Sequence, residues 1–217
     1  MKFDLHVHSK YSQDAAGEIK EIIKKSKKIG LQGVAIVDHN EIKGALEALE
    51  FSEAENFVVI PGIEISTAQG HVIALGVKEI VPSNLELEET ISKIRALSGI
   101  AIAPHPCRPF SKFASFEKVM ALEIFNSRCW EFENKRAEKL SNNLKLGKTA
   151  GSDCHTLEEL GYGITEFETQ SANYENLIED IVKRRTTCYG RYTPKFRILC
   201  QSCKNFKLWL RRGCKRI

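Results

Sequence analysis

The sequence predicts a parallel α/β fold with a polar site along one edge of its sheet. Short apolar runs alternate with segments of helical periodicity as far as about residue 190, and the connections between them are short. This alternation is typical of folds in which helices cover a parallel sheet. Most of the apolar runs also end in His, Asp, Glu or Asn, and all six histidines lie in or beside these runs.

The first strand is predicted from the alternation in residues 1–9, MKFDLHVHS, where apolar side chains at positions 3, 5 and 7 oppose polar ones at 4, 6 and 8. His6 and His8 therefore point the same way. They lie about 7 Å apart along a strand that rises about 3.3 Å per residue. Two imidazoles at this spacing can bind one metal ion, although a pair of histidines on a solvated strand surface has the same pattern.

The next elements follow from periodicity and capping residues. Residues 17–29 place isoleucines on one helical face, and Gly30 follows as a C-cap. The uninterrupted apolar run 34–37 is typical of a buried parallel strand. Asn40 can cap a helix over residues 40–54.

The remaining elements continue the alternation to the end of a single predicted domain, residues 1–190. Further strands are predicted over 57–60, 71–76, 100–103, 119–125, 149–151 and 186–189. Further helices are predicted over 84–98, 130–146 and 174–184. No internal repeat and no low-complexity linker divides this part of the sequence.

The composition is ordinary for a soluble globular protein, with 42% hydrophobic and 28% charged residues in a chain of 217. No apolar run approaches the roughly 18 residues that a transmembrane segment needs, and the N-terminus shows no export signal. Seven cysteines is an odd number, and they are unevenly spread. The sequence therefore favours a reducing, cytoplasmic setting over a disulfide framework.

The net charge of +4 hides a basic C-terminal tail, residues 191–217. Residues 183–217 hold 12 of the 32 Lys and Arg and no acid, so 20 basic side chains oppose 28 acidic ones elsewhere. Apolar and basic residues alternate in the tail. It is therefore expected to form an amphipathic helix that meets nucleic acid or an anionic surface, or one that packs on the domain with its lysines in solvent. Four cysteines could also supply a zinc site there: Cys188, Cys200, Cys203 and Cys214.

Polar residues at the predicted strand ends form the candidate site. They are Asp4, His6, His8, Asp38, His39, Glu64, His105, Asn126, Asp153 and His155, with His71 at the start of a further strand. In a barrel of parallel strands the active site forms at the carboxyl ends. Histidine together with carboxylate is the ligand set of Zn, Mn or Fe. So many candidate ligands suggest more than one metal ion.

These residues resemble the PHP family, the polymerase and histidinol phosphatase domain, over about residues 2–190. Its motifs appear as DLHVHS at 4–9, VDH at 37–39, PGIE at 61–64, GH at 70–71, HP at 105–106 and GSDCH at 151–155. Several motifs in the family's order are far more specific than one His-x-His. The resemblance implies a distorted seven-stranded (β/α) barrel, here with a short basic C-terminal extension.

The resemblance also implies two or three divalent metal ions, Mn, Zn or Fe. The implied ligands of the first are His6, His8, Glu64 and Asp153; of the second, Glu64 as a bridge with His71 and His105; of the third, Asp14, His39 and His155. Some members have histidine where Asp14 stands, and aspartate is a harder ligand. The identity and occupancy of the third metal therefore stay open.

Such a site is expected to hydrolyse phosphate esters, because clustered divalent ions lower the pKa of a bound water and neutralise phosphate oxygens. The predicted catalytic residues are Glu64, Asp153, His155, Arg108 and Arg128. Arg108 and Arg128 follow site-side strand ends and are expected to bind the phosphate, together with Asn126. Solvated loop arginines would show the same pattern.

The predicted function is thus a metal-dependent phosphatase or phosphodiesterase acting on a nucleotide, an oligonucleotide or a small metabolite. Similar short members include 5′→3′ exonucleases and histidinol phosphatases. A metal-dependent amidohydrolase is an alternative that usually needs a lysine at a strand end, and the motifs contain none. A non-enzymatic accessory module is a third alternative, which the intact ligand set disfavours.

Three further residues in the motifs have predicted roles outside the ligand sets: Asp4, Asp38 and Cys154. Asp4 and Asp38 either accept hydrogen bonds from neighbouring imidazoles or fix the strand ends. Cys154 is read as a small filler residue rather than a nucleophile, because the adjacent His155 is expected to bind metal instead of acting as its base.

Overall fold

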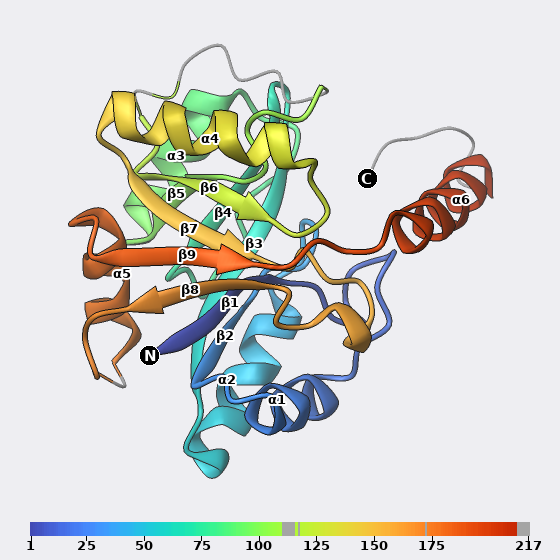
Figure 1. Cartoon of the computed structure of the whole chain (residues 1–217), viewed down its shortest axis with the longest axis horizontal. Coiled ribbons are helices and arrows are strands. Elements are labelled where there is room, and N and C mark those ends of the chain that lie inside the picture. The colour runs from blue at the N-terminus through green and yellow to red at the C-terminus, as the bar shows by residue number, and fades with distance from the viewer. Residues whose placement is uncertain (110–115, 117, 172, 212–217) are drawn as a thin grey trace.

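Nine strands form one strongly curved, nearly closed sheet with helices outside it (Figure 1). The structure is a computed structural model that describes residues 1–109, 116, 118–171 and 173–211. The strands are β1 (Lys2–Val7), β2 (Gly33–Ile36), β3 (Val58–Thr67), β4 (Gly70–Leu75), β5 (Ile100–Ala103), β6 (Ala121–Asn126), β7 (Gly147–Gly151), β8 (Gly163–Phe167) and β9 (Thr186–Gly190). The helices are α1 (Ile19–Lys28), α2 (Lys43–Glu55), α3 (Leu87–Ala96), α4 (Glu131–Leu144), α5 (Tyr174–Val182) and α6 (Lys195–Arg211), with one 3-10 turn at Leu157–Glu159.

The sheet is mixed, with the strand order β7-β6-β5-β4-β3-β2-β1-β8-β9. Parallel pairing joins β1 to β2, β2 to β3, β5 to β6 and β6 to β7. The pairs β3–β4, β4–β5, β1–β8 and β8–β9 are antiparallel. The prediction of a wholly parallel sheet was therefore wrong, because an apolar run reports that a strand is buried and not which way it runs.

Nine strands were found where the resemblance implied seven, and β8 was not predicted at all. Its sequence, GITEF, is short and contains a glycine and a glutamate, so it lacks the plain apolar run that marked the other strands. β3 also continues to Thr67, well beyond the predicted end at residue 60. This longer strand carries Glu64 in its interior.

The two ends of the sheet meet through hydrogen bonds between β7 and the β8–β9 pair. The Thr165 hydroxyl donates to the Ala150 carbonyl at 2.9 Å and accepts from the Ala150 amide at 2.7 Å. Beyond the strand ends, the Asp153 amide donates to the His6 carbonyl at 2.8 Å, and the His8 amide donates to the Cys154 carbonyl at 3.2 Å. The segment after β7 is thus tied to the end of β1.

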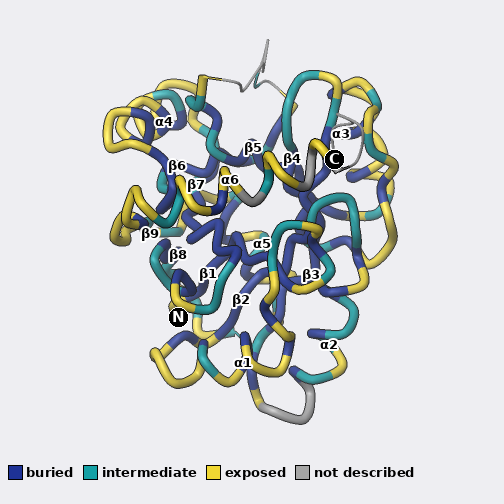
Figure 2. Tube along the Cα trace, turned by 90° about the vertical axis from the view of Figure 1, so that its right-hand side faces the viewer, coloured by how far each residue is buried: buried dark blue, intermediate teal, exposed yellow. Residues whose placement is uncertain are grey.

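Two apolar clusters hold these elements together, and Figure 2 shows the buried strands at the centre of the molecule. One cluster joins α1, α2 and α3 to the sheet, for example through Ile22 and Ile94. The other contains Phe3 and Phe167, which meet edge to face at 5.1 Å, and Leu177 of α5. Each such buried side chain stabilises the fold by about 1.5–3 kcal/mol.

The loop after β2 is fixed by the side chain of Asn40. Asn40 was expected to cap α2, but α2 begins at Lys43 without a side-chain cap. Asn40 instead accepts from the Ser66 amide at 2.8 Å and donates to the Ser66 hydroxyl at 3.1 Å. It therefore ties the loop after β2 to β3.

Candidate metal centre

The predicted ligands lie together at one end of the sheet, and Glu64 is at their centre. Its Oε2 atom is 3.3 Å from Nε2 of both His6 and His8. Its Oε1 atom is 2.9 Å from His71 Nδ1 and 3.3 Å from His105 Nε2. One buried carboxylate therefore faces two groups of imidazoles, one with each oxygen.

The backbone sets Glu64 in this place through the neighbouring strand. The Glu64 amide donates to the Asp38 carbonyl at 3.1 Å, and the Asn40 amide donates to the Glu64 carbonyl at 2.9 Å. These bonds continue the β2–β3 pairing beyond β2 and bring His39 beside Glu64, with Nδ1 at 3.2 Å from Oε2.

Asp153 is a second carboxylate near His6 and His8. Its Oδ1 atom lies 3.8 Å from His6 Nε2 and 3.5 Å from His8 Nε2. Its Oδ2 atom accepts from Asn126 Nδ2 at 3.2 Å and is 3.4 Å from the Arg108 guanidinium. His6, His8, Glu64 and Asp153 thus converge as the first predicted ligand set requires.

Asp14 and His155 lie at a second side of the cluster. Asp14 Oδ2 is 3.1 Å from His155 Nε2 and 3.9 Å from His39 Nε2. The His155 ring is fixed through Nδ1, which lies 2.9 Å from the Asp153 carbonyl oxygen. Asp14, His39 and His155 are the third predicted ligand set, and His39 also contacts Glu64 through Nδ1.

The arrangement fits bound divalent ions. Three overlapping groups have ligand atoms within 4.8 Å of one another: His8, His39 and His155; His6, His8 and Glu64; His39, Glu64 and His71. Within the described part of the chain, the buried atoms His8 Nε2, His39 Nδ1 and Asp14 Oδ1 make no hydrogen bond. Buried polar atoms without partners are costly, and a cation coordinated by nitrogen and oxygen would satisfy them.

The protonation of the cluster suits cation binding at its carboxylates. Burial alone would raise the pKa of Glu64, but the charge of the protonated imidazoles around it, His6 among them, outweighs burial and holds that pKa well below its usual range. Burial lowers the pKa of His39 to about 3, so its imidazole is neutral. Burial also lowers the pKa of His8, yet the carboxylates of Asp153 and Glu64 beside Nε2 outweigh burial and raise that pKa to about 9. A cation bound at His8 would therefore displace a proton.

Two candidate ligands have left-handed backbone conformations, which cost L-residues energy. The φ angle is 32° at His105 and 53° at Asp153. Hydrogen bonds hold both residues in place: the His105 amide donates to Glu123 Oε2 at 2.8 Å, and the Asp153 amide donates to the His6 carbonyl at 2.8 Å. Strain of this kind is concentrated at functional sites.

Comparison with known proteins shows the family of this chain. The profile of the PHP domain matches residues 4–195. The chain belongs to the PHP domain family.

Relatives of this PHP domain include an uncharacterized protein and a probable histidinol-phosphatase. An uncharacterized protein of Methanocaldococcus jannaschii is 37% identical over 158 residues, covering 68% of this chain and 91% of its own. A probable histidinol-phosphatase of Thermotoga maritima is 26% identical over 223 residues, covering 82% of this chain and 95% of its own.

A solved structure shares the fold of this PHP domain. It is a two-domain protein of Bacteroides vulgatus described as containing a predicted PHP-like metal-dependent phosphoesterase, with a TM-score of 0.76 and 16% identity. The match covers 88% of this chain and 65% of that one, so this chain spans about two thirds of the neighbour's length.

Glu123 is the main site residue of this PHP domain that the sequence reasoning missed. It is buried on β6, and its Oε1 atom is 2.9 Å from His6 Nδ1. Its Oε2 atom accepts from the His105 amide at 2.8 Å and from Asn126 Nδ2 at 2.9 Å. The signal was present, since Glu123 is a single acid within a buried apolar strand. Such an acid is rarely buried without partners.

Asp4 and Asp38 fix strand ends and do not contact an imidazole through a hydrogen bond in the described residues. Asp4 accepts from the amides of Ser152 at 2.9 Å and Gly161 at 2.8 Å. Asp38 accepts from the Ser9 amide and from the Ser9 hydroxyl, both at 2.6 Å. Of the two roles considered for these aspartates, fixing the strand ends is therefore the one that the structure supports.

Cys154 is packed in the apolar cluster around α1, and burial raises the pKa of its thiol well above the usual value. A neutral, buried thiol is a poor nucleophile, which agrees with the prediction that Cys154 is a filler residue.

No cluster of metal-ligating atoms among the described residues includes a cysteine of the C-terminal region. Cys188 lies on β9, Cys200 and Cys203 are exposed on α6, and Cys214 lies outside the described residues.

The two predicted phosphate-binding arginines have different surroundings. Arg108 has a side chain that is 30% exposed beside Asp153, so it can reach a bound molecule. The Arg128 side chain is only 7% exposed and pairs with buried Glu159 at 3.2 Å. Glu159 in turn accepts from the His155 amide at 3.2 Å. Asn126 is fully buried and holds Asp153 and Glu123.

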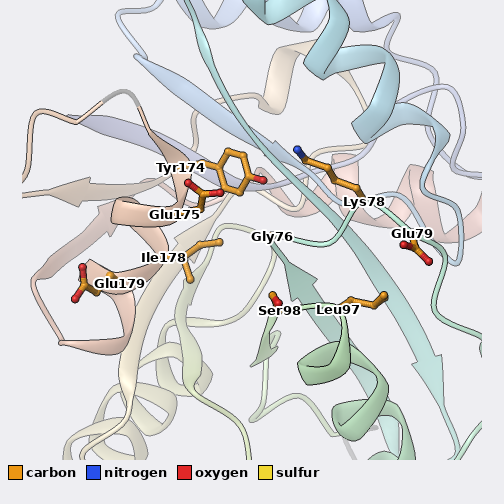
Figure 3. A pocket seen from close by; sticks show the side chains of 9 residues that line it. All are labelled: Gly76, Lys78, Glu79, Leu97, Ser98, Tyr174, Glu175, Ile178 and Glu179. Atoms are coloured by element: carbon orange, nitrogen blue, oxygen red, sulfur yellow. The ribbon is translucent and has the colours of Figure 1, made fainter.

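A surface pocket of about 430 Å³ lies elsewhere, between α5 and the segment after β4 (Figure 3). Its lining combines Lys78 with the acids Glu79, Glu175 and Glu179, beside Tyr174. None of the predicted site residues lines it.

Among the described helices none has the length and apolar character needed to cross a membrane.

Proposed function

We propose that this chain is a metal-dependent phosphoesterase that hydrolyses a phosphate ester through a water activated at the centre around Glu64. The proposal is carried by one observation: both oxygens of a buried carboxylate face imidazoles, and the partly exposed Arg108 lies beside them. Two or three divalent ions, Mn, Zn or Fe, would supply Lewis-acid stabilisation of the phosphate and a water of lowered pKa.

The chain's own residues would hold these ions in the three predicted sets. Glu64 would serve the first and second positions through its two oxygens, because a carboxylate offers lone pairs on both. Asp153 with His6 and His8 completes the first, and His71 with His105 completes the second. Asp14, His39 and His155 would form the third.

Arg108 would bind the phosphate. Its guanidinium lies 3.4 Å from Asp153 Oδ2 and 3.4 Å from Asn126 Oδ1, with part of the side chain open to solvent. Its donors match phosphate oxygens in a bidentate way. Arg128 and Asn126 were also predicted to contact substrate. Their burial and hydrogen bonds instead support a positioning role, in which Asn126 orients Asp153 and Arg128 holds Glu159 under His155.

We further propose a nucleotide or short oligonucleotide as the substrate class. This rests on charge: the C-terminal region from residue 183 carries 12 basic side chains and no acid. Thr193 attaches this region to Ser127 near the site, with the two hydroxyls 2.7 Å apart. Basic side chains beside a phosphoesterase centre would bind further phosphates of such a substrate.

The test is a substrate panel on protein stripped with a chelator and reloaded with Mn²⁺, Zn²⁺ or Fe²⁺. The panel contains a nitrophenyl phosphate monoester and diester, nucleoside monophosphates, a 5′-labelled single-stranded oligonucleotide, histidinol phosphate and an anilide as amide substrate. We expect hydrolysis of phosphate esters, fastest with nucleotides, and loss of it in the Glu64→Gln variant. Hydrolysis of the anilide alone, or equal rates in the variant, would refute the proposal.

A further inference from the structure

The C-terminal segment after β9 is attached to the loop that follows β6. The Thr193 amide donates to the Ser127 carbonyl at 2.8 Å, and Thr193 is almost fully buried. Lys195 Nζ donates to the Cys129 carbonyl at 3.2 Å and lies 3.9 Å above the Trp130 ring. These contacts set the start of α6 beside the candidate centre.

From this start α6 runs to the loop that carries Asp14, and Figure 1 shows the helix outside the sheet next to the blue loop that follows β1. The buried Gln201 donates through Nε2 to the Asp14 carbonyl at 2.6 Å and to Asn205 Oδ1 at 3.0 Å. Asn205 donates through Nδ2 to Asp14 Oδ2 at 3.0 Å. Two amide side chains on successive turns of one helix therefore hold both the backbone and the carboxylate of Asp14.

Asp14 needs such support because its loop has no helix or strand of its own from His8 to Glu18. Backbone hydrogen bonds close turns within the loop, from the Lys10 amide to the Gly17 carbonyl at 2.9 Å and from the Ser12 amide to the Ser9 carbonyl at 3.0 Å. With Oδ2 bound by Asn205, the buried Oδ1 is left without a hydrogen bond in the described residues. Oδ2, the oxygen that Asn205 holds, is also the one that lies 3.1 Å from His155 Nε2 and 3.9 Å from His39 Nε2. Asn205 therefore orients the carboxylate toward these imidazoles before a cation binds.

We propose that α6 is part of the metal centre and that Gln201 and Asn205 are positioning residues for the third divalent ion, the one assigned to Asp14, His39 and His155. The PHP domain profile ends at residue 195, so this support comes from a segment beyond the family match. The proposal rests on the proposed function only in taking these three side chains as ligands. The basic extension thereby sets how many ions the centre holds.

The experiment counts metal ions in the full-length chain. Wild type, Asn205→Asp, Gln201→Ala and His155→Ala are stripped, reloaded with Mn²⁺ and analysed for stoichiometry and for the affinity of each equivalent. Asn205→Asp keeps the shape but sets a second carboxylate against Asp14, which removes the hydrogen bond and adds repulsion. Ser202→Asp is the matched control, since Ser202 is exposed on α6 and its hydroxyl donates to the Ile198 carbonyl within the helix.

We expect Asn205→Asp and Gln201→Ala to weaken one Mn²⁺ equivalent at least tenfold, the same equivalent that His155→Ala removes. The tighter equivalents and the thermal unfolding of the metal-free protein should match Ser202→Asp. If Asn205→Asp binds three Mn²⁺ ions as tightly as wild type, or if wild type binds only two, the role of α6 is overturned and the phosphoesterase proposal stands. If wild type binds no metal, both proposals are overturned. If a folded Asn205→Asp protein loses every Mn²⁺ ion, a role confined to the third ion is overturned.

Discussion

Glu64 combines two demands that no other residue of the site combines. Its oxygens face His6 and His8 on one side and His71 and His105 on the other, and its side chain is 1% exposed. A neutral imidazole offers one lone pair to one metal, whereas a carboxylate can serve two. The charge of Glu64 would also offset the charge of two cations bound beside it in a buried place.

The Glu64→Gln variant should therefore lose more than any single histidine variant. It keeps the shape and removes the charge, so we expect the first and second metal ions to weaken together and turnover to fall by at least a hundredfold. His155→Ala should affect only the third ion and leave partial activity. Metal analysis and turnover of both variants under one assay condition test this, and full metal content in Glu64→Gln would disprove the bridging assignment.

Glu123 acts on the metal centre through His6. Its carboxylate accepts from His6 Nδ1 and so leaves Nε2 as the free lone pair toward Glu64 and Asp153. Partners of this type fix the tautomer and raise the basicity of a ligand imidazole.

The Glu123→Gln variant should lower the affinity of the first metal ion about 10–100-fold. The amide keeps the size of the side chain but can donate to Nδ1 and so favour the wrong tautomer. Calorimetric titration of metal into the stripped protein measures the change. Glu166→Gln is a suitable control on β8, because Glu166 is only partly buried and lies outside the site; equal affinities in the two variants would exclude this role for Glu123.

Arg108 and Arg128 should separate into a substrate-binding and a structural residue. Arg108→Ala should lower kcat/KM for the phosphate ester while metal content and melting temperature stay normal. Arg128→Ala leaves Glu159 buried without its partner, and breaking a buried pair costs about 3–5 kcal/mol. Thermal unfolding and steady-state kinetics of both variants distinguish the roles, and the reverse pattern would show that the arginines were assigned the wrong way round.

At the scale of elements, the direction of β4 explains how His71 joins the site. β3 and β4 are linked by residues 68–69 alone, and a parallel crossover needs a dozen or more residues. β4 must therefore run antiparallel to β3, with Ser66 opposite His71. His71, the second residue of β4, thus lies at the same edge of the sheet as the carboxyl ends of the parallel strands.

The contact between β7 and β8 has no room for a side chain at Gly163. A Cβ atom there would overlap the Gly151 carbonyl, at the end of the strand that leads to Asp153. We expect Gly163→Ala to destabilise the protein by at least about 1–3 kcal/mol, the usual cost of overpacking, and to weaken the metal ion held by Asp153.

The comparison for this prediction is Gly30→Ala, measured by denaturant unfolding alongside it. Gly30 has open space around it but a φ of +85°, so alanine there costs only about 1–2 kcal/mol of backbone energy. Metal affinity should stay normal in Gly30→Ala. If Gly163→Ala unfolds no more easily than Gly30→Ala, the close approach of β7 and β8 does not constrain the fold.

At the scale of the whole molecule, the centre connects segments from both ends of the sequence. His6 and His8 come from β1, Asp153 and His155 follow β7, and Asn205 contributes from α6. A cation bound between them links these segments in the folded state and finds no preformed site in the unfolded chain. Metal binding should therefore stabilise the fold as a whole.

Stripping the metal should lower the melting temperature, and reloading should restore it. At a free ion concentration of 100 Kd, one site contributes about 2.7 kcal/mol, or roughly 5–10 °C for a chain of this size. Differential scanning calorimetry with and without chelator measures the shift. Magnesium-free buffer with calcium is the control, because calcium prefers oxygen ligands; an identical melting temperature in all conditions would argue against a metal centre at these residues.

Local chemistry let the sequence predict much of this protein. The period-2 alternation in MKFDLHVHS predicted β1, and the six histidines beside apolar runs predicted where ligands would gather. The strand β5 and the start of α5 lie at the predicted residues, since short apolar runs and amphipathic periodicity depend on neighbours in the chain. The family motifs carried the membership that the comparisons confirm.

What the sequence could not determine depends on contacts between distant residues. The antiparallel strands, the nine-stranded sheet and the pairing of Arg128 with Glu159 each arise only when the sheet curves and brings its ends together. Glu123 lies 117 residues from His6 in sequence, and Asn205 lies 191 residues from Asp14. The sequence alone determined which residue types could bind metal and that most of them follow apolar strand runs. The tertiary structure alone decided which of them share an oxygen of Glu64 and which are held by α6, because such pairings depend on directions and distances that periodicity does not encode.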